Sequence, residues 1–307
     1  MNTAMASINH ADPLADGGTM IPDCGVIYVA TQELKFVCEA IASAESVRRL
    51  FPHLSITLMT DLTDDTRPIP PFDMLRTFHL PLLPGVSPWS KGLYARVATM
   101  ACSPYRRTIS LDTDTRVLRR EFLQIFDELE HHTLVAVPCV PEHAAAYKWV
   151  GPMFNGGMIG YRKDEYSARL FRDWEALQRR HLGLLGADDL TQVPYGTAQD
   201  VKARRFVLGT NQPSLALLVT PGQPNAYGMT VKELPYAFNA HGCPRDQLDG
   251  IVVDHFVSHK VEREGVGDFL EARGLEFLQH ARARQFDAIS VMGVVAVATA
   301  AKDAVWR

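Results

Sequence analysis

Apolar and polar positions along the chain form two kinds of pattern, one typical of strands and one typical of helices. Short runs rich in β-branched and other apolar residues are typical of buried strands, and they predict strands over 24–30, 55–60, 75–80, 109–111, 133–139, 158–162, 234–240 and 251–257. Apolar residues at helical spacing predict helices over 32–50, 90–102, 121–130, 164–180, 214–219 and 265–284. Strand, helix and strand follow one another in the first third, so we expect an α/β fold, a parallel sheet covered by helices.

Polar residues stand at the carboxyl ends of several predicted strands. Thr31, Asp61 and the pair Asp112 and Asp114 each directly follow such a strand. In open α/β sheets, ligands bind beyond these strand ends. We therefore expect the polar strand ends to converge on one crevice. For Thr31 or Asp61 alone, the capping of a helix or a turn is the simpler alternative.

The pair Asp112 and Asp114 carries the clearest chemistry. Residues two apart on an extended strand point to the same side, so both carboxylates face one way if the strand geometry persists to Asp114. Adjacent carboxylates repel each other and are costly to bury without compensation. Mg²⁺ and Mn²⁺ take oxygen ligands and often bridge protein carboxylates to substrate phosphates. The alternative is a polar turn in which Asp112 caps the following segment.

Further candidate residues lie elsewhere in the predicted elements. Lys91 and Arg96 lie on the helix 90–102, where they would either carry charge to a diphosphate or face solvent. Asn155 precedes two glycines, which indicate close backbone approach, a positive φ or a turn needed only for folding. Its amide suits sugar hydroxyls. His255 ends a late strand and offers an imidazole as a third metal ligand, although a lone histidine is also common as a packed or surface residue.

Composition narrows the classes of function. Of the 307 residues, 47% are hydrophobic and 21% charged, as in a soluble globular protein with a sizeable core. The net charge of −4 gives no electrostatic footprint for nucleic-acid binding. Five scattered cysteines without a C-x-x-C motif indicate reduced thiols in a cytoplasmic protein and argue against a zinc site or a disulfide framework.

The two ends of the chain predict little chemistry. Residues 1–23 lack the regions of a secretory signal, and we expect them to be a disordered lead-in to a single domain over 24–284. The apolar run 288–301 is shorter than the about 20 residues that span a bilayer. We expect 285–307 to be a helix packed on the domain, with a peripheral membrane contact as the alternative.

Four motifs, in order, resemble those of nucleotide-sugar glycosyltransferases of the GT-A fold. They are Y-V-A-T at 28–31, L-D-T-D at 111–114, F-N-G-G-M-I at 154–159 and N-Q-P-S at 211–214, and the stretch D-H-F-V-S-H-K at 254–260 is a weaker fifth. The likeness is to the retaining group that includes glycogenin and bacterial lipopolysaccharide galactosyltransferases. It spans most of the chain, and the ordered set is more specific than any single motif.

This resemblance implies a mostly parallel, twisted sheet flanked by helices. It also implies the transfer of a hexose from a nucleotide-diphospho-sugar, such as a UDP-sugar, to a hydroxyl of a carbohydrate, lipid-linked or protein acceptor. Asp112, Asp114 and His255 would hold Mn²⁺ or Mg²⁺ at the diphosphate. Thr31 and Asp61 would contact the base or ribose. The remaining implied donor-binding residues are Ala30, Lys91, Arg96, Thr113, Gly156, Gly157 and Lys260, and the implied catalytic group is Asn155, Asn211 and Gln212.

The chain departs from the family pattern at two places. The family usually has Asp-Gln where this chain has Asn211 and Gln212, and an amide cannot act as a nucleophile or a general base. The late family motif is H-x-x-G-x-x-K, whereas here Ser258 replaces the glycine and Lys260 falls one residue early. His259 therefore competes with His255 as the third ligand. Both departures leave the stereochemical outcome open.

Two alternatives to a glycosyltransferase remain. A non-catalytic nucleotide-sugar-binding relative would keep the fold and lose turnover, which the amide of Asn211 favours. A sugar nucleotidyltransferase would carry a glycine-rich phosphate loop after the first strand, and the sequence Ala30-Thr31-Gln32-Glu33 has no glycine there. The acceptor is not predicted by the sequence, and a cytoplasmic location follows from where nucleotide sugars are made.

Overall fold

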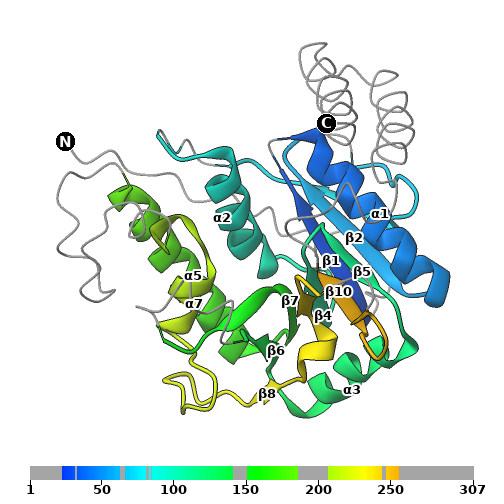
Figure 1. The fold of residues 1–307 in the computed structure, drawn as a ribbon. Helices are drawn as coiled ribbons and strands as arrows, with labels where there is room; N and C mark the ends of the chain where they lie inside the picture. The colour runs from blue at the N-terminus through cyan, green and yellow to red at the C-terminus, as the bar shows by residue number, and fades with distance from the viewer. Residues whose placement is uncertain are drawn as a thin grey trace. The chain divides into compact units, whose positions relative to one another are not determined.

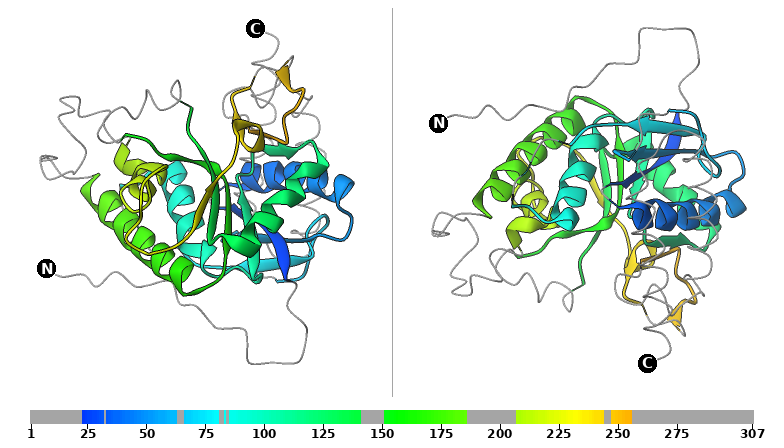
Figure 2. Two further views of the ribbon diagram at one scale, coloured as in Figure 1. Left: turned by 90° about the horizontal axis from the view of Figure 1, so that it is seen from below. Right: turned by 90° about the horizontal axis from the view of Figure 1, so that it is seen from above.

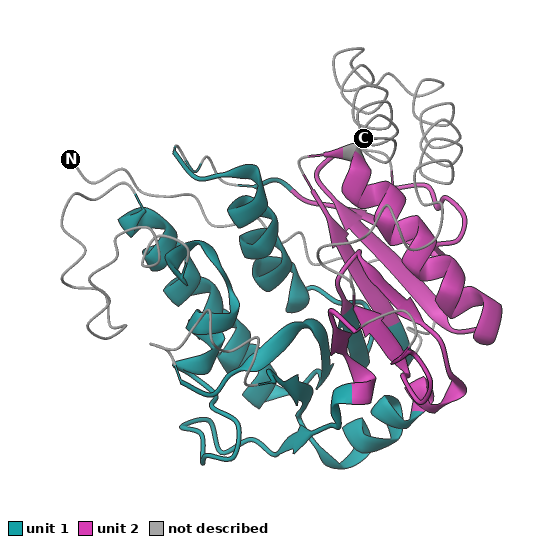
Figure 3. Cartoon of the chain, viewed as in Figure 1, with its two compact units in different colours: residues 1–25, 79–110, 124–236 teal, residues 26–78, 111–123, 237–307 magenta. Residues whose placement is uncertain are grey.

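The computed structural model describes two compact units (Figure 3). The residues described are 23–31, 33–62, 66–80, 83, 85–140, 151–185, 207–243 and 247–255. Unit 1 comprises residues 1–25, 79–110 and 124–236, and unit 2 comprises residues 26–78, 111–123 and 237–307. The large sheet of the chain has seven strands, of which three fall mainly in unit 2 and four mainly in unit 1. The predicted α/β class is confirmed.

Unit 2 holds the first strands, the long helix α1 and a small second sheet (Figures 1 and 2). Its strands of the large sheet run in the order β3-β2-β1, and β2 pairs with β3 in parallel, with Leu58 opposite Leu75. The small sheet has the order β5-β10-β9. The elements are β1 (Cys24–Ala30), α1 (Leu34–Leu50), β2 (Ser55–Thr60), β3 (Met74–Thr77), β5 (Thr115–Val117), a 3₁₀ turn η2 (Arg120–Leu123), β9 (Ala240–His241) and β10 (Val253–His255).

Unit 1 holds the other strands of the large sheet, in the order β4-β7-β6-β8. β6 pairs with β8 in parallel and with β7 antiparallel, with Ala136 opposite Ile159. Two helices, α2 and α5, lie side by side (Figures 1 and 2). The elements are α2 (Pro88–Met100), β4 (Arg107–Leu111), α3 (Gln124–His131), β6 (Leu134–Pro138), β7 (Phe154–Arg162), α5 (Glu165–Leu184), α7 (Gln212–Ala216) and β8 (Val231–Glu233).

Local chemistry explains where these elements begin. Ser87 caps α2 by accepting a hydrogen bond from the Ser90 amide, and Pro88 occupies the first helical position, where its missing N–H has no cost. Asp164 and Ser167 form a capping box at the start of α5. The strands β1, β2, β4, β6 and β7 are almost wholly buried, and their apolar side chains supply much of the core.

Several predicted boundaries were wrong. The run 234–240 is not a strand, because Pro235 lacks an N–H and Tyr236–Phe238 folds into the 3₁₀ turn η4. The third strand is the shorter β3, the helix predicted over 214–219 begins at Gln212, and the helix predicted over 121–130 begins as a 3₁₀ turn. The helix predicted over 90–102 begins at Pro88, and Glu33, rather than Thr31, precedes α1.

Parts of the predicted organisation lie outside the described residues. These are the lead-in before residue 23, Gln32, most of the irregular segment 138–152, the helices predicted over 265–284 and 285–307, and the residues His259 and Lys260. The extent of the single domain stays a prediction. Among the residues that the structure describes, no helix is long and apolar enough to cross a membrane.

Candidate functional site

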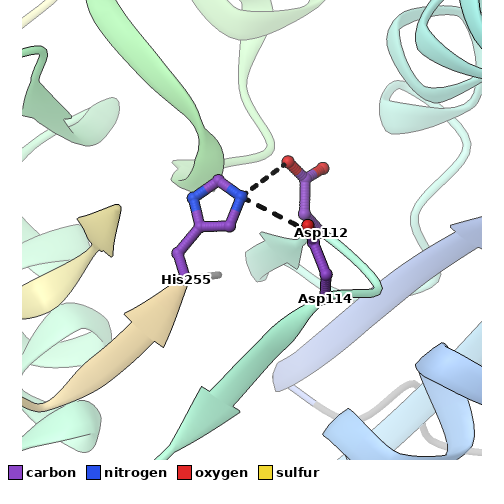
Figure 4. A group of neighbouring side chains, drawn as sticks. All are labelled: Asp112, Asp114 and His255. Carbon is purple, nitrogen blue, oxygen red and sulfur yellow. Dashed lines mark ion pairs between the residues drawn. The ribbon is translucent and has the colours of Figure 1, made fainter. Parts of the chain in front are cut away.

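Three side chains of unit 2 converge on one point (Figure 4). His255 Nε2 lies 3.5 Å from Asp112 Oδ2 and 3.6 Å from Asp114 Oδ1. One potential ligand atom from each of the three residues lies within 4.8 Å of the others. The side chains of His255 and Asp114 are 4% and 9% exposed, and that of Asp112 is 27% exposed, so the cluster is closed on one side and reachable on the other.

The two aspartates reach this point through a turn. Asp112 follows β4, Thr113 and Asp114 form the turn, and β5 begins at Thr115. The extended geometry does not persist to Asp114, yet both carboxylates lie near the same imidazole nitrogen of His255. The turn sends the intervening Thr113 elsewhere, since its hydroxyl donates to Glu39 Oε2 at 2.9 Å.

Hydrogen bonds from α1 and β1 hold this turn in place. Thr115 Oγ1 donates to the Asp112 carbonyl oxygen at 2.8 Å and lies 2.9 Å from Ser43 Oγ. Ser43 in turn shares a hydrogen bond of 2.9 Å with the Tyr28 hydroxyl. All of these groups are buried or nearly so. Buried hydroxyls with satisfied partners fix a unique conformation, so the backbone of Asp112 is anchored to the core of unit 2.

His255 comes from the central strand of the small sheet. β10 pairs antiparallel with β5, so His255 lies opposite Thr115, directly after the aspartate turn. The Leu118 amide extends this ladder by donating to the Val252 carbonyl oxygen at 2.8 Å. The pairing of β5 with β10 therefore brings together ligands that lie far apart in the sequence. His259, the competing ligand, lies in the part of the chain left undescribed.

The donor set fits a divalent cation. Two carboxylate oxygens and one imidazole nitrogen are ligands that Mn²⁺ and Mg²⁺ sites accept, with oxygen preferred by both and nitrogen tolerated better by Mn²⁺. Buried charges in proteins are paired or coordinate metals. Two neighbouring carboxylates beside one imidazole form a set of groups that a dication could bind. The geometry is therefore one that could hold a metal ion.

The predicted nucleotide-contacting residues of unit 2 stand at neighbouring strand ends. Ala30 ends β1 and is fully buried, and Thr31 follows it. Asp61 follows β2, which neighbours β1 in the sheet. Thr31 is 3% exposed, and within the described residues its Oγ1 makes no hydrogen bond. An unsatisfied buried hydroxyl is rare in native proteins and indicates an absent ligand or water.

A second group of predicted residues gathers in unit 1, around Gly156 of β7. A Cβ placed on Gly156 would lie 3.4 Å from Gln212 Cγ, 3.5 Å from Arg96 Nη1 and 3.6 Å from Asn211 Oδ1. The Gly156 amide donates to Gln212 Oε1 at 2.6 Å. Arg96 is buried and donates from Nε to Ser110 Oγ at 3.1 Å. These contacts define a polar cluster of a cation and amides around a residue without a side chain.

Gly156 and Gly157 do not depend on a backbone conformation that only glycine adopts. Both lie in the extended strand β7, and neither is among the glycines with positive φ in the described residues. The Gly157 amide donates to Asn155 Oδ1 at 2.8 Å. Asn155 therefore uses its carbonyl oxygen within the strand. A positive φ and a turn are therefore wrong for these glycines, and a Cβ on Gly156 would make only ordinary contacts, so close backbone approach does not require glycine there either.

Side chains of α5 and α7 donate hydrogen bonds to the backbone of Asn211. Its carbonyl oxygen accepts from Trp174 Nε1 at 3.0 Å and from Ser214 Oγ at 2.8 Å, and Ser214 Oγ lies 2.6 Å from Gln178 Oε1. The Asn211 side chain makes no capping hydrogen bond to α7. It is 3% exposed, and no described residue accepts a hydrogen bond from its Nδ2.

Lys91 and Lys260 are not brought to either group by a described contact. Lys91 lies half-buried in the first turns of α2, and Lys260 lies outside the described residues. Conversely, sequence reasoning missed the supporting residues Glu39, Ser43 and Ser46. They recur on one face of α1 at spacings of four and three. Buried polar residues on one helix face indicate that they form hydrogen bonds with a neighbouring segment.

Comparisons with known proteins were made by sequence and by structure. No protein-family model matches the chain, and no curated protein matches it either. A solved structure of the galactosyltransferase LgtC, in complex with donor and acceptor sugar analogues, is similar to it, with a TM-score of 0.50 and 13% identity. The match covers 81% of this chain and 95% of that chain.

Two further glycosyltransferase structures are similar at lower scores. The apo form of GlyE from Streptococcus pneumoniae TIGR4 has 13% identity and a TM-score of 0.48, and the match covers 85% of this chain and 64% of that chain. A glycosyltransferase involved in the glycosylation of the major capsid of PBCV-1 has 10% identity and a TM-score of 0.40, and the match covers 82% and 100%. At such identities the likeness to LgtC shows the fold, and this chain therefore has the GT-A fold that its motifs predicted.

Proposed function

We propose that this chain is a metal-dependent glycosyltransferase that moves a hexose from a nucleotide-diphospho-sugar, a UDP-sugar in the first instance, to an acceptor hydroxyl. The observation that carries the proposal is the convergence of Asp112, Asp114 and His255. The fold supports it, because the LgtC structure of the same fold was solved with donor and acceptor sugar analogues. Fold alone does not fix function, so the proposal depends on the residues and geometry of the site.

In this proposal unit 2 provides the metal and nucleotide contacts. Asp112, Asp114 and His255 hold Mn²⁺ or Mg²⁺, which when bound supplies positive charge to the diphosphate leaving group. Thr31 offers its unsatisfied hydroxyl to the nucleoside, and Asp61 accepts from a ribose hydroxyl. Backbone groups of Ala30 and Thr113 complete the contacts.

The polar cluster of unit 1 provides the sugar contacts. Arg96 and the amides of Asn155, Asn211 and Gln212 bind sugar hydroxyls, and the absent side chain of Gly156 leaves room for the ring. Gly157, Lys91 and Lys260 complete the proposed donor set. Acid–base chemistry does not fall to Asn211 or Gln212, because an amide does not ionise.

The proposed reaction balances without a protein nucleophile. The bond between the anomeric carbon and the phosphate oxygen breaks, and the acceptor oxygen bonds to the anomeric carbon. The departing phosphate takes the proton of the acceptor hydroxyl. Retention of configuration follows when acceptor and leaving group share one face of the sugar. The reaction is placed in the cytoplasm, where nucleotide sugars are made and where the five free cysteines would stay reduced.

Thermal unfolding with nucleotides tests the metal-dependent half of the proposal. We expect UDP together with Mn²⁺ to raise the Tm of the full chain by several degrees, because ligands that bind only the folded state stabilise it. Replacing both ligands by isosteric amides, Asp112→Asn with Asp114→Asn, should abolish this shift. Asp127→Asn, on an exposed position of α3, is the matched control and should leave the shift intact. A shift that survives without Mn²⁺ or in the double variant would count against the site.

A non-catalytic nucleotide-sugar-binding relative is the second candidate function. The observation that favours it is the neutral amide at Asn211, where the resembled family has a carboxylate. Such a protein would show the same metal-dependent shift with UDP but would not release UDP from a UDP-sugar. Turnover, rather than binding, separates the two candidates.

A further inference from the structure

His241 lies beside the metal ligand His255. β9 and β10 pair in parallel, with His241 in register with His255. Their ring centroids are 4.9 Å apart and the ring planes meet at 76°, an edge-to-face arrangement. Aromatic rings favour this geometry because the positive edge of one meets the negative face of the other.

The small sheet places His255 between two neighbours. β10 is the central strand in the order β5-β10-β9, with Thr115 of β5 opposite His255 on one side and His241 of β9 in register on the other. Side chains in register on adjacent strands project from the same face of a sheet. The aspartates enter from the β5 side, so the ring of His241 backs the imidazole from the opposite side.

A metal-ligating imidazole must point one nitrogen at the ion. Two side-chain torsions of a histidine turn its ring, and fixing them on binding costs rotamer entropy. Groups that fix the ring in advance remove this cost, and loss of the hydrogen-bond partners that do so in metal sites typically lowers metal affinity by about 10–100-fold. In the structure, Nε2 of His255 already faces both Asp112 and Asp114. Neighbouring groups must hold the ring of His255 in that orientation.

We propose that His241 is a positioning residue of the metal centre: its ring packs against the His255 imidazole and keeps Nε2 directed at the two aspartates. The inference rests on the proposed metal site. His241 acts through His255, because within the described residues the group of candidate ligand atoms comprises Asp112, Asp114 and His255 and no atom of His241. His241 therefore contributes through the packing of its ring against His255, and not through a nitrogen that binds the metal.

Mn²⁺ titration of the full-length variants tests this role. We expect His241→Ala to weaken Mn²⁺ binding by about 10-fold, measured by calorimetry and by electron paramagnetic resonance of free Mn²⁺. His241→Phe keeps an aromatic ring without a metal-binding nitrogen and should bind within about twofold of the unaltered chain. His132→Ala, which removes a histidine of unit 1, should not change the affinity. Thermal unfolding of each variant shows that the fold is retained.

The outcomes separate this inference from the proposed function. Equal Mn²⁺ affinities of the His241→Ala variant and the unaltered chain would overturn the inference alone. A loss in His241→Phe as large as in His241→Ala would also overturn it, because the nitrogen rather than the ring would then matter. Spin-echo modulation should show one nitrogen bound to Mn²⁺, and two would make His241 a ligand. An unaltered chain that binds no Mn²⁺ would contradict both the inference and the proposed metal site.

Discussion

At the scale of single residues, burial determines which protonation state a histidine side chain adopts in the folded protein. His181 of α5 is almost fully buried, and desolvation, with a smaller contribution from Arg180, lowers its pKa from 6.5 to about 4. A neutral imidazole is therefore the folded form at any pH above this value. The unfolded chain, which takes up a proton near pH 6.5, does not share the restriction. The stability of the protein must then depend on pH through this one side chain.

The sign of this dependence gives a prediction. The contribution of His181 is fully present above pH 6.5 and is lost as the pH falls towards 4, since only the unfolded chain binds the proton in that interval; the loss is at most on the order of 3 kcal/mol. His181→Leu should unfold with a smaller difference between pH 7.5 and pH 5 than the unaltered chain. Urea unfolding at the two pH values measures it. The exposed His131, replaced by Leu, is the control, and equal pH dependence in all three proteins would exclude the assignment.

At the scale of elements, two of the three glycines in β7, Gly160 and Gly156, have different structural roles. A Cβ on Gly160 of β7 would lie 2.9 Å from Ile125 Cγ2 and 3.3 Å from Val135 Cβ, closer than packed atoms allow. A Cβ on Gly156 would make only ordinary contacts of 3.4 Å or more, all of them with polar side chains of the cluster in unit 1. The first glycine lets α3 pack on the strand. The second keeps a polar space open.

These different roles predict that replacing each glycine by alanine affects a different property of the protein. Gly160→Ala should lower the free energy of unfolding by about 1–3 kcal/mol, the usual cost of overpacking. Gly156→Ala should leave stability nearly unchanged but weaken the binding of a UDP-sugar severalfold, while the binding of UDP itself is retained. Chemical unfolding and calorimetry distinguish the two. Equal affinity of Gly156→Ala for the UDP-sugar would place the donor sugar elsewhere.

The elements also show what the sequence could predict. The hydrophobic runs located most of the strands, and the spaced aspartates and His255 were correctly chosen as one cluster. The turn at Thr113 and Asp114 could not be read from alternation, because it depends on hydrogen bonds to side chains of α1, which lies far away in the sequence. The 3₁₀ turn at Tyr236–Phe238 was mistaken for a strand, although Pro235 was a local warning. Register between β9 and β10, which sets His241 beside His255, depends on tertiary pairing and has no local signal.

At the scale of the whole molecule, each unit contains one complete group of candidate residues. The proposed metal ligands and the proposed nucleotide-contacting strand ends belong to unit 2, and the polar cluster around Gly156 belongs to unit 1. Each group is held by contacts within its own unit, such as Thr115 to Asp112 or Trp174 to Asn211. The net charge of −4 leaves anion binding to local groups. A metal ion and a buried arginine are the local groups suited to a diphosphate and its sugar.

The central claim is that Asp112, Asp114 and His255 hold a cation required for breaking the bond between sugar and diphosphate. The most direct measurement is the release of UDP and free sugar when the full chain is incubated with a panel of UDP-sugars and Mn²⁺. We expect release from at least one donor, abolished by a chelator, restored by added Mn²⁺ and lowered by about 100-fold or more in the Asp112→Asn and Asp114→Asn double variant. Release that is unchanged by the chelator or by the double substitution would contradict the claim.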